Sequence, residues 1–372
     1  MMITANNGFI EQSERYAFDN AGESLKKYIL LQKGELAYNH GASKLRPFGS
    51  CFALTTAESA RIPFVYHCFS AENKNAEFLS IELNGSEVES QLRKIVSSGA
   101  RMDGLLNISF DEYSTVTVLL PDIKEQEHIA DFFRNLDHLI TLHQRKFDKL
   151  QVLKKAMLEK MFPKNGSSVP EIRFKGFTDA WEQRKFGEVV ERITRKNENL
   201  ESTLPLTISA QYGLINQNEF FDKRIASKDV SGYFLVRNGE FAYNKSTSSD
   251  APWGAIKRLD RYESGVLSTL YIVFKILDES KTSSDYIVTY YNTDLWHKGI
   301  QAIAAEGARN HGLLNVAPAD FFETNLTMPK DYAEQQQIGS FFQQLDHLIT
   351  LHQRELEKLQ NIKKSILEKM FV

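Results

Sequence analysis

The chain contains only two cysteines, Cys51 and Cys68, among its 372 residues. They form no CxxC pair, so neither a disulfide framework nor a cysteine zinc site is expected, and we predict two buried structural thiols. No apolar run approaches the roughly 18 residues of a membrane-spanning helix. The first residues, MMITANNGFIEQ, also lack the basic and apolar regions of a secretory signal. We therefore expect a folded protein in the cytoplasm.

The sequence has no excess charge of either sign. Its 45 Lys and Arg residues and 48 Asp and Glu residues give a formal net charge of -3, so any nucleic-acid surface must be a local patch. A hydrophobic content of 42%, with 25 Phe and 14 Tyr, is typical of globular domains. The length allows about two or three of them.

Motifs of catalysis are also missing. The sequence has no GxxxxGK[ST] phosphate loop, no GxGxxG, no HExxH and no Pro-Pro pair of the kind an adenine methylase needs. Glu72-Asn73-Lys74 and Glu279-Ser280-Lys281 loosely match the Glu-x-Lys of metal nucleases, but the first has no nearby upstream Asp, and both are better interpreted as solvated loops. We therefore predict a non-catalytic chain with no metal site and no bound cofactor.

The most informative feature is a long internal repeat. Residues 129–162, IADFFRNLDHLITLHQRKFDKLQVLKKAMLEKMF, recur at 338–371 as IGSFFQQLDHLITLHQRELEKLQNIKKSILEKMF, with about 23 of 34 positions identical. Shorter matches precede each copy: YILLQKGELAYN answers YFLVRNGEFAYN, and GARMDGLLN answers GARNHGLLN. The sequence between these matches diverges strongly. This pattern indicates two modules that share a fold and recognise different things.

Each module is predicted to be α+β, because short β-rich runs such as YILL, ELAY, FVYHCF, TVTVLLP, YFLV, EFAY and TLYIVFKI alternate with helical stretches such as 87–97. We expect two similar mixed domains separated by two long helices packed as an antiparallel coiled coil with a pseudo-twofold internal repeat. The ranges are 1–120 for the first recognition domain, 121–168 for the central helix and linker, 169–328 for the second domain and 329–372 for the C-terminal helix.

The two repeated helices carry an apolar heptad stripe that predicts their mutual interface. Its residues are Phe133, Leu136, Ile140, His143 and Leu150 in the first helix and Phe342, Leu345, Ile349, His352 and Leu359 in the second. Lys154 and Lys363 also interrupt the stripe. We interpret the polar interruptions as control of register and orientation, and a role in contacting a partner or ligand stays open.

Polar and basic side chains follow the repeated strands and turns, where they can read base edges and neutralise phosphates. The candidates are Tyr38, Asn39, His40, Lys44, Arg46, Arg101 and Asn107 in the first module and Tyr243, Asn244, Lys245, Lys257, Arg258, Arg309 and Asn315 in the second. Two alternatives stay open, since the strand ends are equally typical of solvated hairpin loops and the arginines of structural loop caps.

A family resemblance accounts for these features together. PEIRFKGFTDAWEQRKFGEVVERI at 170–193, the two GE-x-AYN strands, the GAR-x-x-GLLN turns and the paired LDHLITLHQR helices resemble the specificity (S) subunit of type I restriction-modification systems. The resemblance implies a non-catalytic DNA-recognition subunit in which each domain reads one half of a bipartite asymmetric target. It also implies helices that set the spacing, two modification subunits that use S-adenosylmethionine, and two restriction subunits that use ATP and magnesium.

The sequence departs from this family in one respect. Met1 aligns with Leu206 of the second copy, so the first copy has no counterpart of residues 169–205 within these 372 residues. We expect an incomplete first domain, and an alternative start, a rearrangement and supply of the segment by another polypeptide all stay open. The alternative function is a coiled-coil adaptor, or an inactive S subunit without DNA specificity.

Overall fold

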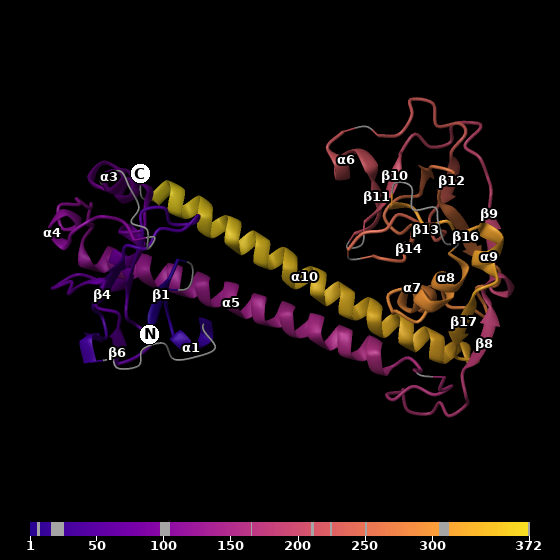
Figure 1. The fold of residues 1–372 in the computed structure, drawn as a ribbon, viewed down its shortest axis with the longest axis horizontal. Coiled ribbons are helices and arrows are strands. Elements are labelled where there is room, and N and C mark those ends of the chain that lie inside the picture. Colours follow the sequence, from indigo (N-terminus) through magenta and orange to yellow (C-terminus); the bar gives the residue numbers. More distant parts are fainter. Residues whose placement is uncertain are drawn as a thin grey trace. The chain divides into compact units, whose positions relative to one another are not determined.

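The computed structural model describes residues 1–5, 8–15, 26–96, 105–164, 166–209, 212–223, 225–249, 251–304 and 312–370. The chain forms two compact units. Unit 1 comprises Met1–Lys146 and His352–Val372, and unit 2 comprises Phe147–Leu351. Two long helices, α5 (Ile123–Lys160) and α10 (Tyr332–Met370), each contribute one half to each unit (Figure 1).

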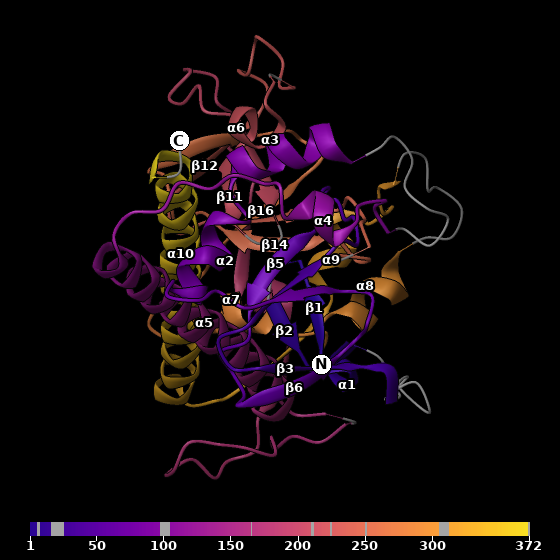
Figure 2. The ribbon, with the colours of Figure 1, turned by 90° about the vertical axis from the view of Figure 1, so that its left-hand side faces the viewer.

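The globular part of unit 1 is built from short antiparallel strand pairs and helices (Figure 2). Its strands are β1 (Met2–Thr4) paired with β2 (Gly8–Ile10), β3 (Ile29–Gln32) paired with β6 (Ser59–Ile62), and a sheet in the order β5 (Ser50–Ala53), β4 (Leu36–Asn39), β7 (His67–Phe69). Its helices are α1 (Gln12–Arg15), α2 (Ala76–Glu82), α3 (Ser86–Ile95) and α4 (Phe110–Tyr113).

Unit 2 has the same plan with additional strands. The pairs are β10 (Leu206–Ser209) with β11 (Gly213–Asn216), β12 (Phe234–Arg237) with β15 (Ser264–Leu267), and β8 (Glu182–Lys185) with β17 (Asn325–Met328). A four-stranded sheet has the order β14 (Ala255–Arg258), β13 (Phe241–Asn244), β16 (Ile272–Ile276), β9 (Val190–Ile193). The helices are η2 (Phe186–Glu188), α6 (Gln217–Phe221), α7 (Ser284–Tyr290), α8 (His297–Ile303) and α9 (Pro318–Phe322).

The repeat seen in the sequence is present in the packing. In unit 1, Tyr38 of β4 stacks on Tyr113 of α4, with ring centroids 4.0 Å apart. In unit 2, Tyr243 of β13 stacks in the same way on Phe321 of α9, at 5.0 Å. The backbone N–H of Asn75, the N-cap of α2, donates to Oε1 of the buried Gln126 at 3.1 Å, and that of Ser283, the N-cap of α7, donates to Oε1 of the buried Gln335 at 2.9 Å. These equivalences confirm the predicted α+β fold with an internal repeat.

The long helices run antiparallel within each unit. In unit 1, Asp137 of α5 pairs with Lys363 of α10, and His143 contacts His352, so the partner number falls as the α5 number rises. In unit 2, Lys154 pairs with Asp346. Every predicted interface side chain is buried or half-buried, and the fully buried ones are Phe133, Leu136, Phe342 and Leu345. The apolar heptad stripe is thus a less exposed side of each helix.

One predicted strand is wrong. The run TVTVLLP at 115–121 begins in a turn and belongs to no strand in unit 1, whereas its counterpart in unit 2 contains β17. The reason is pairing, because β17 is a strand through its ladder with β8, and among the described residues of unit 1 no strand pairs with residues 115–121. Among the described helices, none is sufficiently long and apolar to cross a bilayer.

Candidate nucleic-acid interface

Each unit joins the two short fingerprints that the sequence repeats. In unit 1, the Leu106 N–H donates to the carbonyl of His40 at 2.8 Å. In unit 2, the Leu314 N–H donates to the carbonyl of Lys245 at 2.9 Å. The end of the AYN strand and the GLLN segment are therefore held side by side by equivalent backbone bonds, although they lie more than 60 residues apart in sequence. The residues that end the AYN strands therefore lie beside the GLLN segments in both units.

An asparagine shapes each strand end. The side-chain oxygen Oδ1 of Asn39 accepts a bond from the Gly41 N–H at 2.9 Å, and that of Asn244 accepts one from the Ser246 N–H at 3.0 Å. This contact is an Asx turn, which redirects the chain without a helix or strand partner. A loop of different sequence follows this turn in each unit, whereas the backbone arrangement at the turn is the same.

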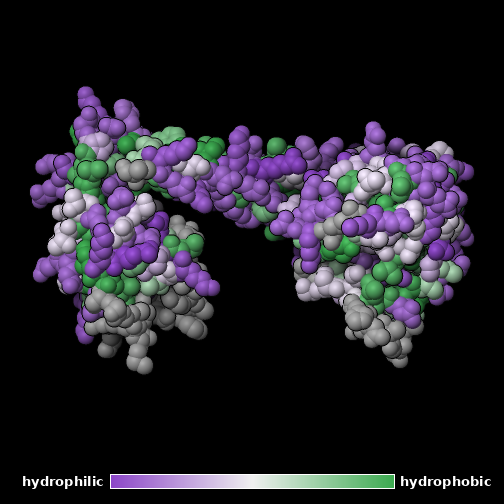
Figure 3. All heavy atoms as spheres, turned by 90° about the horizontal axis from the view of Figure 1, so that it is seen from above, coloured by the Kyte–Doolittle hydropathy of each residue, from purple (hydrophilic) through white to green (hydrophobic). Residues whose placement is uncertain are grey.

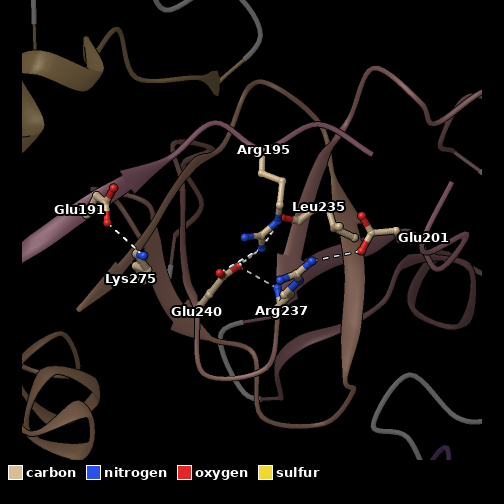
Figure 4. Close-up of polar contacts among 7 residues, drawn as sticks. All are labelled: Glu191, Arg195, Glu201, Leu235, Arg237, Glu240 and Lys275. Carbon is tan, nitrogen blue, oxygen red and sulfur yellow. Dashed lines mark hydrogen bonds and ion pairs between the residues drawn. The ribbon is translucent and has the colours of Figure 1, made fainter. Parts of the chain in front are cut away.

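The glutamate of the GE-x-AYN fingerprint has a structural role (Figure 4). Glu240 accepts the Arg237 N–H at 2.8 Å and both of its carboxylate oxygens bond Arg195 Nη2, at 3.0 and 2.8 Å. In unit 1, Glu35 caps the same turn by accepting the Gln32 N–H at 2.7 Å. In each unit, the fingerprint glutamate thus holds the turn that precedes β4 or β13.

Three of the predicted DNA-binding side chains lie in the core. Tyr38 donates to the Phe48 carbonyl at 2.7 Å, and Tyr243 donates to the Trp253 carbonyl at 2.8 Å. Burial raises the pKa of both hydroxyls. The His40 ring is buried too, with Nδ1 3.0 Å from the Leu106 carbonyl. None of these side chains can reach a base edge without leaving the core, so the proposed interface does not include them.

Basic side chains on β14 are bonded within unit 2. Arg258 contacts Asp260 at 2.6 Å, Asp285 at 2.8 Å and the Ser284 hydroxyl at 2.7 Å. Lys257 donates to Asn292 Oδ1 at 3.0 Å, and its pKa is lowered by burial and by the nearby positive charge of Lys154. These two cations fasten β14 to the helices, and we therefore leave them out of the proposed interface.

Arg46 is likewise bonded to its own unit, unit 1. Its guanidinium donates to the Asn84 carbonyl at 2.7 Å, and burial lowers its pKa. The half-buried Lys245 ammonium lies 3.4 Å from the Val316 carbonyl, and burial lowers its pKa also. Lys245 differs from Arg46 in lying directly at the Asx turn, so it stays a candidate for the interface.

The remaining candidates are exposed or lie outside the described residues. Lys44, Asn107 and Asn315 are exposed, at the loop after β4 and at the two GLLN segments. Arg101 and Arg309 fall outside the part of the chain that the structure describes. The candidate interface therefore consists of Asn39, Lys44, Asn107, Asn244, Lys245 and Asn315, with the two arginines as untested members.

Sequence analysis missed exposed aromatic residues around α6. Tyr212, Phe220 and Phe221 are 53%, 47% and 42% exposed, beside the exposed cations Lys223 and Lys228. Exposed aromatic rings next to cations suit stacking on nucleotides. The EFFDK run that encodes them is the signal that would have found them.

The long helices carry a second exposed feature, an apolar face away from their seam. Leu139 and Leu142 of α5 are 44% and 36% exposed, and their counterparts Leu348 and Leu351 of α10 are 41% and 44% exposed. Figure 3 shows such apolar side chains among the mainly hydrophilic ones. Apolar residues exposed at equivalent places in both helices are typical of a binding surface used twice. We call these four residues the leucine face.

No group of three or more His, Cys, Asp or Glu side chains suited to a metal ion occurs among the described residues.

Comparison with known proteins identifies the fold. No protein-family model and no curated protein sequence matches the chain. Among solved structures, the S subunit of a type I restriction-modification system from M. genitalium matches with a TM-score of 0.56 and 12% identity, over 93% of this chain and 85% of that one.

Two further structures match with a TM-score of 0.43 and 16% identity. One is the HsdS subunit from Thermoanaerobacter tengcongensis, matched over 92% of this chain and 81% of that one. The other comes from work on complex assembly and conformational transition of the type I R-M system, over 92% and 82%. The chain therefore has the fold of a type I restriction-modification S subunit.

Proposed function

We propose that this chain is a DNA sequence-recognition subunit of a type I restriction-modification complex. Each unit reads one half of a bipartite, asymmetric target, and the long helices set the spacing between the halves. The fold shared with the M. genitalium S subunit supports this proposal, as does the internal repeat.

One observation carries the proposal. Equivalent backbone bonds join the AYN strand and the GLLN segment in both units, and an Asx turn then starts a loop that differs at most of its positions between them. A constant frame with divergent loops is what two modules need if they bind the same polymer and read different sequences. The exposed residues Lys44, Asn107 and Asn315 and the half-buried Lys245 lie at this frame.

The chemistry belongs to partners in this proposal. Two modification subunits supply adenine methylation with S-adenosylmethionine, and two restriction subunits supply ATP- and magnesium-dependent cleavage. The leucine face supports a pair of identical partners, because the same exposed side chains recur in α5 and α10. The chain itself binds double-stranded DNA, performs no reaction and acts in the cytoplasm.

Selection from randomised duplex DNA tests the proposal directly. The complex of this chain with its modification subunit should enrich two short half-sites at a fixed separation. Recovery of random sequences by a well-assembled complex would contradict sequence recognition and favour the coiled-coil adaptor.

A further inference from the structure

Comparison of the two units reveals a surface that is covered in unit 2 and open in unit 1. In unit 2, the segment Pro170–Ile193 crosses the unit and supplies β8 and β9. Among the described residues of unit 1, no segment takes its place. Three sets of contacts made by this segment can each be compared with the equivalent surface of unit 1.

The first contact is a strand ladder. In unit 2, Leu326 and Met328 of β17 pair with β8 and are 1% and 2% exposed. In unit 1, the counterpart of Met328 is Leu120, which is 39% exposed, and its neighbour Leu119 is 79% exposed. At these residues the chain belongs to no helix and to no strand. It therefore presents a ready backbone edge with apolar side chains that a further strand would bury.

Hydrogen bonds on one side of this segment determine which of its backbone groups remain for a further strand on the opposite side. In unit 2, the carbonyls of Asn325 and Thr327 accept bonds from tyrosine hydroxyls of α7. In unit 1, the counterpart of Asn325 is Thr117, and Gln91 of α3 bonds both its N–H and its carbonyl at 2.8 Å. Alternate residues of an extended chain face opposite sides. By this alternation, we expect the backbone groups of Val118 and Leu120, the counterparts of Leu326 and Met328, to be the ones with which a further strand would pair.

The second contact is the sheet edge. In unit 2, β16 is covered on its outer side by β9, and Ile272, Val273 and Phe274 are at most 2% exposed. In unit 1, the equivalent strand β7 ends the sheet, and all three of its residues are only half-buried. An uncovered edge strand is a template for a further strand.

The third contact is a buried ion pair. Glu334 of α10 is 1% exposed and accepts bonds from Arg173 Nε at 2.7 Å, from Arg173 Nη2 at 2.8 Å and from Trp181 Nε1 at 3.2 Å. The counterpart of Glu334 in unit 1 is Glu125, whose side chain is exposed. A carboxylate at this position can receive an arginine in a bidentate pair.

An aromatic contact beside this ion pair is also present in unit 2 and has an uncovered counterpart in unit 1. In unit 2, Phe174 packs edge-on against Phe341 of α10, with ring centroids 6.0 Å apart. In unit 1, the counterpart of Phe341 is Phe132, which is 44% exposed. The open surface thus offers a carboxylate and an aromatic ring at the positions that Arg173 and Phe174 contact in unit 2.

We propose that unit 1 carries an acceptor surface, formed by β7, Thr117–Leu120, Glu125 and Phe132, for a second copy of the segment Pro170–Ile193. The bound segment adds one strand beside Thr117–Leu120 and another beside β7, and its arginine pairs with Glu125. The proposal rests on the internal repeat and does not depend on DNA recognition.

The test uses a synthetic peptide of residues 169–195 added to the full chain. Binding should be measurable by calorimetry, and Glu125→Gln should weaken it about tenfold or more, since hydrogen bonds to charged groups are among the stronger ones. The matched control is Glu127→Gln, an exposed glutamate on the same helix that is not the counterpart of Glu334, and it should leave the affinity unchanged.

A double-mutant cycle identifies the partner atom. The Arg173→Ala peptide should bind the wild-type chain about tenfold more weakly and bind the Glu125→Gln chain with little further loss. Independent losses that multiply, or an affinity unaffected by Glu125→Gln, would overturn the proposed docking.

If the peptide does not bind, a fusion protein provides a second test of the acceptor surface. Residues 169–205 placed directly before Met1 should protect the amides of Val118 and Leu120 from hydrogen exchange, as the ladder with β8 protects β17. Failure of both the peptide and the fusion would overturn the proposal.

Discussion

Nδ1 of His143 lies 3.1 Å from Nδ1 of His352, and the two residues are separated by the repeat distance of 209. A residue that contacts its own counterpart shows that the helix contact is symmetric. The ion pairs agree, because Asp137 with Lys363 and Lys154 with Asp346 are counterparts of each other. Of the polar residues in the heptad stripe, the two histidines thus contact each other, and the two lysines contact aspartates of the other helix, as register control requires.

The histidine contact predicts a pH dependence. Two neutral imidazoles can share one hydrogen bond, and two protonated ones cannot. Burial lowers the pKa of His352 below its usual 6.5, with smaller contributions from the positive charges of His143 and Lys146. Because the unfolded chain binds this proton more readily, the stabilising contribution is complete above about pH 6.5 and is lost as the pH falls below it.

Thermal melts across this range check the prediction. The melting temperature should fall between about pH 7.5 and about pH 5.5, and the double variant His143→Gln/His352→Gln should fall less steeply. The control is His138→Gln/His347→Gln, an exposed pair of counterparts on the same helices. A slope that changes equally in both variants would show that the seam histidines are not responsible.

The two symmetric ion pairs should differ in strength. Lys154 is 23% exposed and lies near the half-buried Lys257, whose pKa is lowered by Lys154 and raised by Asp346. Asp346→Asn leaves two lysines together without their carboxylate, whereas Asp137→Asn removes a more exposed pair worth about 0.2–1 kcal/mol. Denaturant unfolding should therefore show the larger loss for Asp346→Asn, and Lys257→Gln should restore part of it. Equal losses would contradict the coupling.

Neighbouring leucines on α5 should separate packing from partner binding. Leu136 is 6% exposed in the seam, so Leu136→Ala should cost about 2–5 kcal/mol of unfolding free energy. Leu139 belongs to the leucine face, and Leu139→Ala should change that free energy by less than about 0.5 kcal/mol. We expect the combined variant Leu139→Ala/Leu348→Ala to weaken binding of the modification subunit in a pull-down. Undiminished binding would exclude the leucine face as the docking surface.

Two substitutions at Asn244 separate its role in the Asx turn from its proposed role in reading a base. Asn244→Asp keeps the oxygen that accepts the Ser246 N–H and removes the amide donor, whereas Asn244→Ala removes both. If the amide reads a base edge, both variants should lose about 1–3 kcal/mol of binding to the specific target, confined to the half-site of unit 2. A loss with Ala alone would assign Asn244 to the turn. Titration with cognate and half-site-scrambled duplexes measures the difference.

The sequence predicted the helices better than the loops for a physical reason. The heptad stripe that contains Phe133 and Leu136 can be predicted to be buried from local sequence alone, because residues three and four apart share one helix face. The run at 115–121 needed a partner strand, which no local pattern reports. Tyr38 and Tyr243 looked like recognition residues because they precede Asn39 and Asn244, yet β4 and β13 are buried on both faces, so the tyrosines lie in the core.

The most direct measurement is methylome sequencing of a methylation-deficient host that expresses this chain together with its modification subunit. The account predicts methylated adenines in one bipartite, asymmetric motif with a fixed gap. Absence of any motif, with both subunits expressed and assembled, would contradict DNA recognition by this chain.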